Sequence, residues 1–408
     1  MISNLEKLNE NLGAKKIFHI LNKDEEDAVC LFVGGCVRDL LINKEVSDID
    51  FATSLNPEKV KKKLNASNIS YNDNFKNYGS IKIEINNQFY EVNTLRKDFD
   101  EDGRHSSVIF TQDWRQDALR RDFTINSIYC DLNGRVYDPF KGIEDLKNGI
   151  IKFIGDPIKR IQQDHLRALR YFRFFIQFSK VNYDEYIISC INKNQDKIGN
   201  LSKFKLIDEF KKILLTGKAY KLFQNSFVKD FYLSIYKGIK YLTRLEFYRN
   251  KKVLSNDIDW VILLSLLLID QTKNFERFVK DFQLSNDVKN RLSNLQMQFT
   301  FKTTDKIEKI DTLKKVVLKY GVPSVTDFIH FQYLINDKYD YLLYEKNLNI
   351  IKKTTSPKFE FDIDILKKRG FKEDKNIGNA LNFIKQRWLA NNYQISDKDV
   401  DDAVQLFK

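Results

Sequence analysis

Residues 31–53 read LFVGGCVRDLLINKEVSDIDFAT, and this stretch predicts the fold of the first part of the chain. The apolar start is typical of a strand, the Gly34-Gly35 pair of a tight turn, and the following CVRDLL of the first turns of a helix. Unpaired N–H groups at such a helix start can bind a phosphate, and Arg38 adds a positive charge beside them. Because many turns between a strand and a helix use glycine for geometry alone, this motif needs support from its neighbours.

The same stretch ends on two aspartates, Asp48 and Asp50, in a strand-like run. Side chains two residues apart on a strand point to the same face, so the two carboxylates are expected to lie side by side. Two like charges this close are costly unless a cation lies between them, and Mg²⁺ prefers a few carboxylates together with substrate phosphates. We therefore predict a metal site here. Glu91 in QFYEVNTLR is a candidate third carboxylate if its strand is the neighbour, and a surface position for it is an equal alternative.

Two later segments carry clustered charge. Residues 113–131, DWRQDALRRDFTINSIYCD, contain Arg121 and Asp122, which on their own indicate only an exposed charge cluster. In residues 160–174, RIQQDHLRALRYFRF, four charged residues recur every third position, and on a helix they would share one slowly drifting stripe. These four are Asp164, Arg167, Arg170 and Arg173; on the same helix Leu166, Leu169, Phe172 and Phe174 would face the core.

The patterns along the chain predict an α+β protein. Short alternating runs bounded by Gly or Asn crowd into the first 155 residues and indicate a small mixed sheet. After Gly155-Asp156-Pro157 the pattern changes to long apolar-periodic stretches with little glycine, which favours helices to the end of the chain. A linker is expected near KKTTSPKFEFD, residues 352–362. The length of 408 residues allows more than one unit.

Charge is divided unevenly along the chain. The net charge is +12, yet residues 1–150 hold 21 basic and 25 acidic residues, and the remainder holds 47 and 31. The first part is therefore at −4 and the rest at +16, which fits a carboxylate-rich site followed by a surface for a polyanion. The competing interpretation is that the excess of basic residues serves only to keep the protein in solution.

Other features exclude several classes of protein. The most apolar run, Trp260–Ile269, stops at Asp270 and is too short to span a membrane, so a buried core helix is expected. The N-terminus shows no apolar signal region, and a cytoplasmic location is expected. The four cysteines show no disulfide or metal spacing and are expected to be reduced and buried: Cys30, Cys36, Cys130 and Cys190.

The motifs GGCVRD, DID, RRDFTIN and QDHLRALRYFRF, in this order and spacing, resemble class II tRNA nucleotidyltransferases. These are the CCA-adding enzymes and bacterial poly(A) polymerases of the DNA polymerase beta superfamily. The motifs cover residues 29–175, and residues 362–388 are similar to the family's tail. The resemblance implies a nucleotidyltransferase head at residues 1–155, a helical neck with the base-recognition helix at 156–215, and a helical body at 216–350 and tail at 351–408 that bind tRNA.

The resemblance also implies a role for each motif residue. Asp48 and Asp50 would hold Mg²⁺, with Glu91 as a candidate third ligand. Asp164 and Arg167 would recognise the base. The other nucleotide-binding residues would be Gly34, Gly35, Arg38, Arg121, Asp122, Arg170 and Arg173. Cytosine and adenine both present an amine donor beside a ring-nitrogen acceptor, so an Asp–Arg pair would select them over guanine and uracil. The chain departs from the family at Gln163, where Glu is usual.

We therefore expect template-independent addition of CCA to the tRNA 3′ end from CTP and ATP, with release of pyrophosphate. The alternatives are a poly(A) polymerase and a partial enzyme that adds only A or only CC. The sequence has no extra basic stretch after the DID segment, which disfavours the first, and residues 95–114 fill the place of the family's flexible loop, which disfavours a CC-adding enzyme. A non-catalytic RNA-binding protein would not need the paired aspartates. Neither a membrane nor an obligate protein partner is expected.

Overall fold

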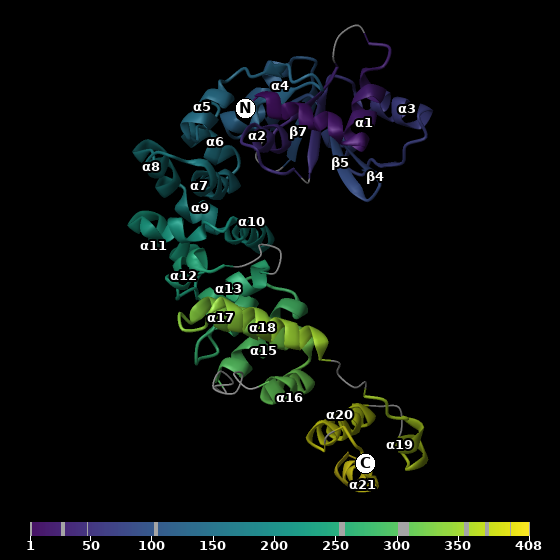
Figure 1. The fold of residues 1–408 in the computed structure, drawn as a ribbon. Coiled ribbons are helices and arrows are strands. Elements are labelled where there is room, and N and C mark those ends of the chain that lie inside the picture. The colour runs from purple at the N-terminus through teal and green to yellow at the C-terminus, as the bar shows by residue number, and fades with distance from the viewer. Residues whose placement is uncertain are drawn as a thin grey trace. The chain divides into compact units, whose positions relative to one another are not determined.

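The structure is a computed structural model that describes residues 2–25, 29–46, 48–101, 105–252, 258–300, 310–354, 359–371, 375–391 and 393–407. The chain forms two compact units, Met1–Lys212 and Ile213–Lys408, and each is described by itself. Among the described residues, strands occur only in the first unit, and after the last strand every regular element is helical (Figure 1). The predicted α+β class is confirmed. The finer division into head, neck, body and tail stays a prediction.

The first unit is built on a seven-stranded sheet with the order β3-β4-β5-β2-β1-β8-β9. Strands β2 and β5 are parallel, and every other neighbouring pair in this sheet is antiparallel. The short alternating runs of the first 155 residues account for six of the sheet's seven strands, and β3 was not expected from the sequence. The seven strands are β1 (Cys30–Val33), β2 (Ile49–Thr53), β3 (Tyr71–Asn72), β4 (Ser80–Ile85), β5 (Gln88–Thr94), β8 (Tyr129–Cys130) and β9 (Val136–Tyr137).

The segment at residues 95–114, expected to be a flexible loop, contains regular structure. Strands β6 (Arg96–Glu101) and β7 (His105–Phe110) pair antiparallel as a separate two-stranded sheet. The β-branched and aromatic residues of SSVIF favour such a strand. Residues 102–104, which include Arg104, lie outside the described part of the chain.

Helix α1 packs on one face of the seven-stranded sheet, and Ala118 of α4 joins Val33 and Ala52 on the other. Phe18 of α1 stacks on Phe32 of β1 with ring centroids 5.6 Å apart. At Gly13 a Cβ atom would lie 2.2 Å from the Tyr90 hydroxyl, so α1 can pack this close to β5 only with glycine there. The first-unit helices before the last strand are η1 (Ile2–Glu10), α1 (Leu12–Asn22), α2 (Gly35–Leu41), α3 (Pro57–Ala66), η2 (Lys76–Tyr78), α4 (Trp114–Arg120) and η3 (Thr124–Asn126).

The rest of the first unit is helical and leads into the second. Helix α7 is amphipathic: Leu169, Phe172 and Phe174 are buried as predicted, while Leu166 is only half-buried. The helices are α5 (Gly142–Asn148), α6 (Pro157–Gln163), α7 (Leu166–Phe178), α8 (Glu185–Lys193), α9 (Gln195–Gly199) and α10 (Lys203–Leu215). The last of these runs across the boundary between the two units.

The described part of the second unit is formed by helices. Trp260–Leu268 forms α13, whose residues from Val261 onward are all buried, as the apolar run predicted. The elements are η4 (Ala219–Gln224), α11 (Ser226–Ile235), α12 (Arg244–Asn250), α13, α14 (Asn274–Asp281), α15 (Asn286–Thr300), α16 (Ile310–Tyr320), α17 (Val322–Ile335), α18 (Tyr341–Lys353), α19 (Asp364–Lys368), α20 (Lys375–Ala390) and α21 (Asp397–Phe407). Helices α19 to α21 share a small apolar cluster around Leu366 and Ile384.

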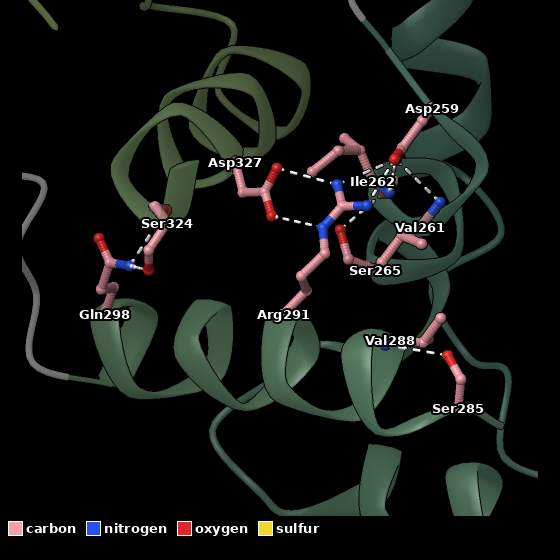
Figure 2. Close-up of polar contacts among 10 residues, drawn as sticks. All are labelled: Asp259, Val261, Ile262, Ser265, Ser285, Val288, Arg291, Gln298, Ser324 and Asp327. Carbon is pink, nitrogen blue, oxygen red and sulfur yellow. Dashed lines mark hydrogen bonds and ion pairs between the residues drawn. The ribbon is translucent and has the colours of Figure 1, made fainter. Parts of the chain in front are cut away.

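Arg291 of α15 connects three helices of this unit (Figure 2). Its guanidinium lies 2.5 Å from Asp259 at the start of α13 and 2.8 Å from Asp327 of α17. Asp259 also accepts hydrogen bonds from the backbone N–H groups of Val261 and Ile262, which caps α13. Both carboxylates are therefore already engaged within the fold.

One further expectation is met. All four cysteines are free and buried. None of the helices in the described ranges is long and apolar enough to cross a membrane.

Candidate active site

A cavity of about 690 Å³ in the first unit brings the sequence motifs together. Its wall includes every residue predicted from the sequence except Glu91: Gly34, Gly35, Arg38, Asp48, Asp50, Arg121, Asp122, Asp164, Arg167, Arg170 and Arg173. The remaining lining comes from Cys36, Asp39, Glu45, Val46, Asn126, Leu166, Phe174 and Lys212. Four segments that lie far apart in the sequence thus meet around one polar space, and each contributes charged side chains to it.

The glycine turn forms one end of the cavity. Gly34 precedes α2 with a φ of +78°, a conformation that favours glycine, and Gly35 begins the helix. Arg38 is buried, and its Nη1 donates to Asn126 Oδ1 at 2.5 Å while its Nε contacts Asp39 at 2.9 Å. Its guanidinium also lies over the Phe174 ring at 5.0 Å. Arg38 is therefore held rigidly behind the turn.

The three acidic residues of the predicted metal site occupy neighbouring positions. Asp48 is exposed just before β2, Asp50 is half-buried within it, and Glu91 lies directly beside Asp50 on the parallel strand β5. Burial, then the charge of Glu91 and more weakly that of Asp48, raise the pKa of Asp50 to about 6, against an opposing effect of Arg121. Glu91 accepts a hydrogen bond from the Ser80 hydroxyl at 2.6 Å.

This donor set matches a cation that takes part of its ligands from a substrate. Within the described ranges, no three His, Cys, Asp or Glu side chains converge closely enough to hold a metal ion by themselves. Mg²⁺ commonly binds one or two carboxylates together with substrate phosphates and water, so a pair of carboxylates facing a phosphate-binding turn fits it. Burial is the main cause of the raised pKa of Asp50, and a bound cation would relieve the repulsion from Glu91 that adds to it.

Arg121 is anchored by a buried aspartate that the sequence did not reveal as functional. Asp117 of α4 is fully buried, and it contacts Arg121 at 3.1 Å and Arg120 at 2.8 Å. It also accepts from the Tyr129 hydroxyl at 2.8 Å. Burial alone would raise the pKa of Asp117, but the two guanidinium groups and the hydroxyl together lower it. The position of Asp117 three and four residues before the arginines was a local signal for this contact.

Asp122 is buried, which overturns its interpretation as part of an exposed charge cluster. Its carboxylate contacts Arg170 of α7 at 2.6 Å and accepts from the Asn126 side chain at 2.9 Å. Burial by itself would raise the pKa of Asp122, but Arg170 and Asn126 lower it. Since Asn126 also binds Arg38, one amide links the carboxylate to the glycine-turn arginine.

Asp164 does not lie on the helix that carries the arginines, so the predicted four-residue stripe is wrong at its first member. The chain leaves α6 at Gln163, and Asp164 has extended backbone angles. Its side chain accepts from the backbone N–H of Leu166 at 3.1 Å, where α7 begins. Aspartate favours this position because its carboxylate satisfies an unpaired N–H at a helix start.

Arg167 lies in the first turn of α7 with its guanidinium fixed by backbone oxygens. Its Nη1 donates to the Arg160 carbonyl at 3.0 Å and to Gln163 Oε1 at 3.2 Å, and its Nη2 donates to the Arg120 carbonyl at 3.2 Å. Gln163, the departure from the family, also accepts from Arg160 at 2.7 Å. Asp164, in the break between α6 and α7, and Arg167, in α7, thus line the same cavity.

Arg173 is paired with a residue that local sequence could not reveal. It contacts Glu209 of α10 at 2.5 Å, and Glu209 is 1% exposed. The two residues are 36 positions apart, so no helical spacing connects them. Arg170 and Arg173 therefore both have carboxylate partners within the fold, and their guanidinium groups are oriented by these partners.

Comparison with known proteins identifies the family. Residues 30–152 match the poly A polymerase head domain. The chain is 30% identical over 379 residues to a zebrafish (Danio rerio) protein named CCA tRNA nucleotidyltransferase 1, mitochondrial, which covers 90% of this chain and 85% of the relative. The chain belongs to the class II CCA tRNA nucleotidyltransferases. It is therefore a nucleotidyltransferase.

Solved structures of CCA-adding enzymes have the same fold. The Bacillus stearothermophilus CCA-adding enzyme in complex with CTP matches with a TM-score of 0.69 at 21% identity, over 98% of this chain and 96% of that one. The Thermotoga maritima CCA-adding enzyme complexed with tRNA matches with a TM-score of 0.56 at 19% identity, over 100% and 98%. The likeness supports a sheet-containing head followed by helices.

Proposed function

We propose that this CCA tRNA nucleotidyltransferase adds C, C and A to the 3′ end of tRNA from CTP and ATP without a nucleic-acid template. The observation that carries this proposal is the single cavity, in which the glycine turn, the paired aspartates and the Asp164–Arg167 pair all meet. A relative named CCA tRNA nucleotidyltransferase, and solved structures of CCA-adding enzymes in complex with CTP and with tRNA, support the same substrates.

The proposed reaction is an in-line displacement at the α-phosphorus. The 3′-hydroxyl of tRNA attacks, the bond to the β-phosphate oxygen breaks, and pyrophosphate leaves. Gly34, Gly35 and Arg38 would hold the triphosphate, and Arg121 and Asp122 would position its sugar or phosphate. Asp48 and Asp50, with Glu91 beside them, would hold Mg²⁺. The bound cation would neutralise charge on the phosphates and the attacking oxygen.

Base selection is assigned to Asp164 and Arg167. Asp164 can accept from the exocyclic amine that cytosine and adenine share, and Arg167 can donate to the ring nitrogen beside it. The carbonyl groups of Arg120 and Arg160 hold the guanidinium in one orientation, which favours selection by fixed donors. Arg170 and Arg173, oriented by Asp122 and Glu209, would complete the positive wall around the nucleotide.

The excess of basic residues after residue 150 supports tRNA binding by the helical part of the chain, in the proposed body and tail. The cytoplasmic location stays a prediction, since a relative named as mitochondrial matches most of the chain.

The test uses purified protein, a tRNA transcript that lacks CCA, and labelled nucleotides with Mg²⁺. We expect two added residues with CTP alone and three with CTP and ATP together. A tRNA that already ends in CC should accept one residue from ATP. Long tails from ATP alone would instead support a poly(A) polymerase, and addition confined to C or to A would support a partial enzyme. A protein with no incorporation at all would contradict the proposed function.

A further inference from the structure

The sheet face beyond the catalytic carboxylates carries exposed aromatic residues next to a lysine. Phe89 of β5 is 62% exposed, and Phe75, which precedes η2, is 53% exposed. Lys82 of β4 is exposed and lies over the Phe75 ring at 5.7 Å from its centroid. We call these three residues the aromatic platform. An exposed ring on a strand beside a proposed active site is a candidate contact for a substrate.

The strand registers place the platform beside the proposed metal site. Asp50 lies opposite Glu91, and Glu91 lies opposite Lys82, so the three form one row across β2, β5 and β4. Phe89 is two residues before Glu91 on β5 and therefore points to the same face of the sheet. It lies at the end of β5 that is nearer to Asp48 in the register. Diagonal neighbours on adjacent strands are about 7–8 Å apart, which places Phe89 within reach of Lys82.

The line of attack on the α-phosphorus indicates which substrate could bind to the aromatic platform. The glycine turn and Arg38, which would hold the leaving pyrophosphate, adjoin β1, and β2 lies between β1 and β5 in the sheet. The attacking and leaving oxygens must be roughly in line across the α-phosphorus. The attacking hydroxyl must therefore approach from the side of β5 and β4, where the platform lies.

We infer that the aromatic platform binds the single-stranded 3′ end of the RNA primer, with Phe89 stacking on the terminal base. The inference rests on the proposed function and specifies which surface receives the primer. Aromatic rings stack on bases with little regard to sequence, which suits a primer whose last base changes during the reaction. Lys82 supplies a cation for a primer phosphate. The exposed Glu84, which lies opposite Phe89 in the register, would keep the phosphates on the Lys82 side.

The test compares three substitutions of one exposed ring. In Phe89→Ala and in Phe89→Val, which keeps an apolar β-branched side chain, the KM for tRNA lacking CCA should rise about ten-fold. The KM for CTP should not change, and Phe89→Tyr should restore the wild-type value. The matched control is Phe204→Ala, which removes an 81% exposed ring from α10. Lys82→Ala should reduce the slope of log affinity against log salt concentration for tRNA by about one, which corresponds to the loss of one phosphate contact.

The outcomes separate the two proposals. If the wild type adds CCA normally but the KM for tRNA is unchanged in Phe89→Ala, the platform is wrong and the proposed function stands. An equal rise in Phe204→Ala would overturn the platform as well, because the effect would then not be specific to this face. If the wild type adds nothing to tRNA, the proposed function fails and the platform fails with it.

Discussion

The two units each contain a cavity of similar size, about 690 Å³ in the first and about 620 Å³ in the second. The second is lined by Arg291 together with Asp287, Asp327 and neutral side chains. The one arginine of the second cavity is paired with two carboxylates, so this cavity has little positive charge to offer a phosphate (Figure 2). The cavity of the first unit collects five arginines and a glycine turn on its wall.

The difference shows that the volume of a cavity does not identify a nucleotide site. What distinguishes the first cavity is its lining, which combines five arginines with a glycine turn and the exposed Asp48. Bound phosphates and a cation would complement this arrangement. The second cavity has one arginine in its lining, and that arginine is shared between two carboxylates that join helices of the fold. Four predictions test this contrast.

The largest effect is expected for Asp50→Ala. Nucleotide addition should fall by about 10³-fold or more, because the charge that develops on the phosphates would lose its counter-cation. The measurement is initial rate on tRNA lacking CCA at saturating CTP, with circular dichroism to establish folding. Glu58→Ala is the matched control, because this carboxylate is 74% exposed on α3 and should be dispensable. Turnover near the wild-type rate in Asp50→Ala would remove Asp50 from the mechanism.

A smaller effect is expected for Arg167→Ala at the opposite end of the cavity. Preference for CTP and ATP over UTP and GTP should fall about 10- to 100-fold, since one of two discriminating hydrogen bonds is lost. Incorporation assays with all four triphosphates measure it, and Lys159→Ala on the exposed side of α6 is the control. Unchanged selectivity in both Arg167→Ala and Asp164→Ala would place base recognition elsewhere, with Arg170 the next residue to test.

Arg291→Met should affect stability and leave nucleotide choice unchanged. Removing the cation leaves Asp259 and Asp327 facing an apolar side chain, and the free energy of unfolding should fall by about 2 kcal/mol after allowance for partial exposure. Thermal denaturation measures the loss. Arg277→Met, which breaks an exposed pair with Asp281, should change stability by less than about 0.5 kcal/mol. A change in KM for CTP in Arg291→Met would contradict the contrast between the cavities.

The smallest effect is expected for Asp50→Asn without divalent cations. The pKa of Asp50 is raised to about 6 in the folded protein, so the folded state binds the proton more tightly than the unfolded chain does. Ionisation of this carboxylate therefore lowers the free energy of unfolding as the pH rises from about 4 to 6, and the full decrease is reached above that range. Asp50→Asn should be more stable than the wild type by on the order of 1 kcal/mol near pH 7, with no difference near pH 3.5. Denaturation in a chelating buffer at both pH values tests this, and equal stability at pH 7 would contradict it.

Sequence patterns predicted the parts of the fold that depend on local periodicity. Six of the seven strands of the sheet and the buried helix α13 follow from alternation and from apolar runs, because side-chain spacing is set by the backbone geometry of each element. The hairpin of β6 and β7 was missed, since its residues are mostly polar or charged and its strands pair only with each other. The break at Asp164 was missed because a regular three-residue spacing does not show where one helix ends and the next begins.

The residues that line the cavity were largely predictable, and their supporting partners were not. The glycine turn and the paired aspartates carry their chemistry within a few positions of the sequence. Glu209 holds Arg173 across 36 positions, and Asn126 links Arg38 to Asp122, so these contacts exist only after the helices have packed. Position in sequence does not encode such long-range pairing.

Hydrogen–deuterium exchange of the full chain with and without CTP and Mg²⁺ tests most directly where the nucleotide binds. We predict that CTP slows exchange in residues 34–41 and 164–170, which contribute to the wall of the first cavity, and leaves residues 287–294 and 320–327 unchanged. Protection around Arg291 without protection of the glycine turn would contradict it.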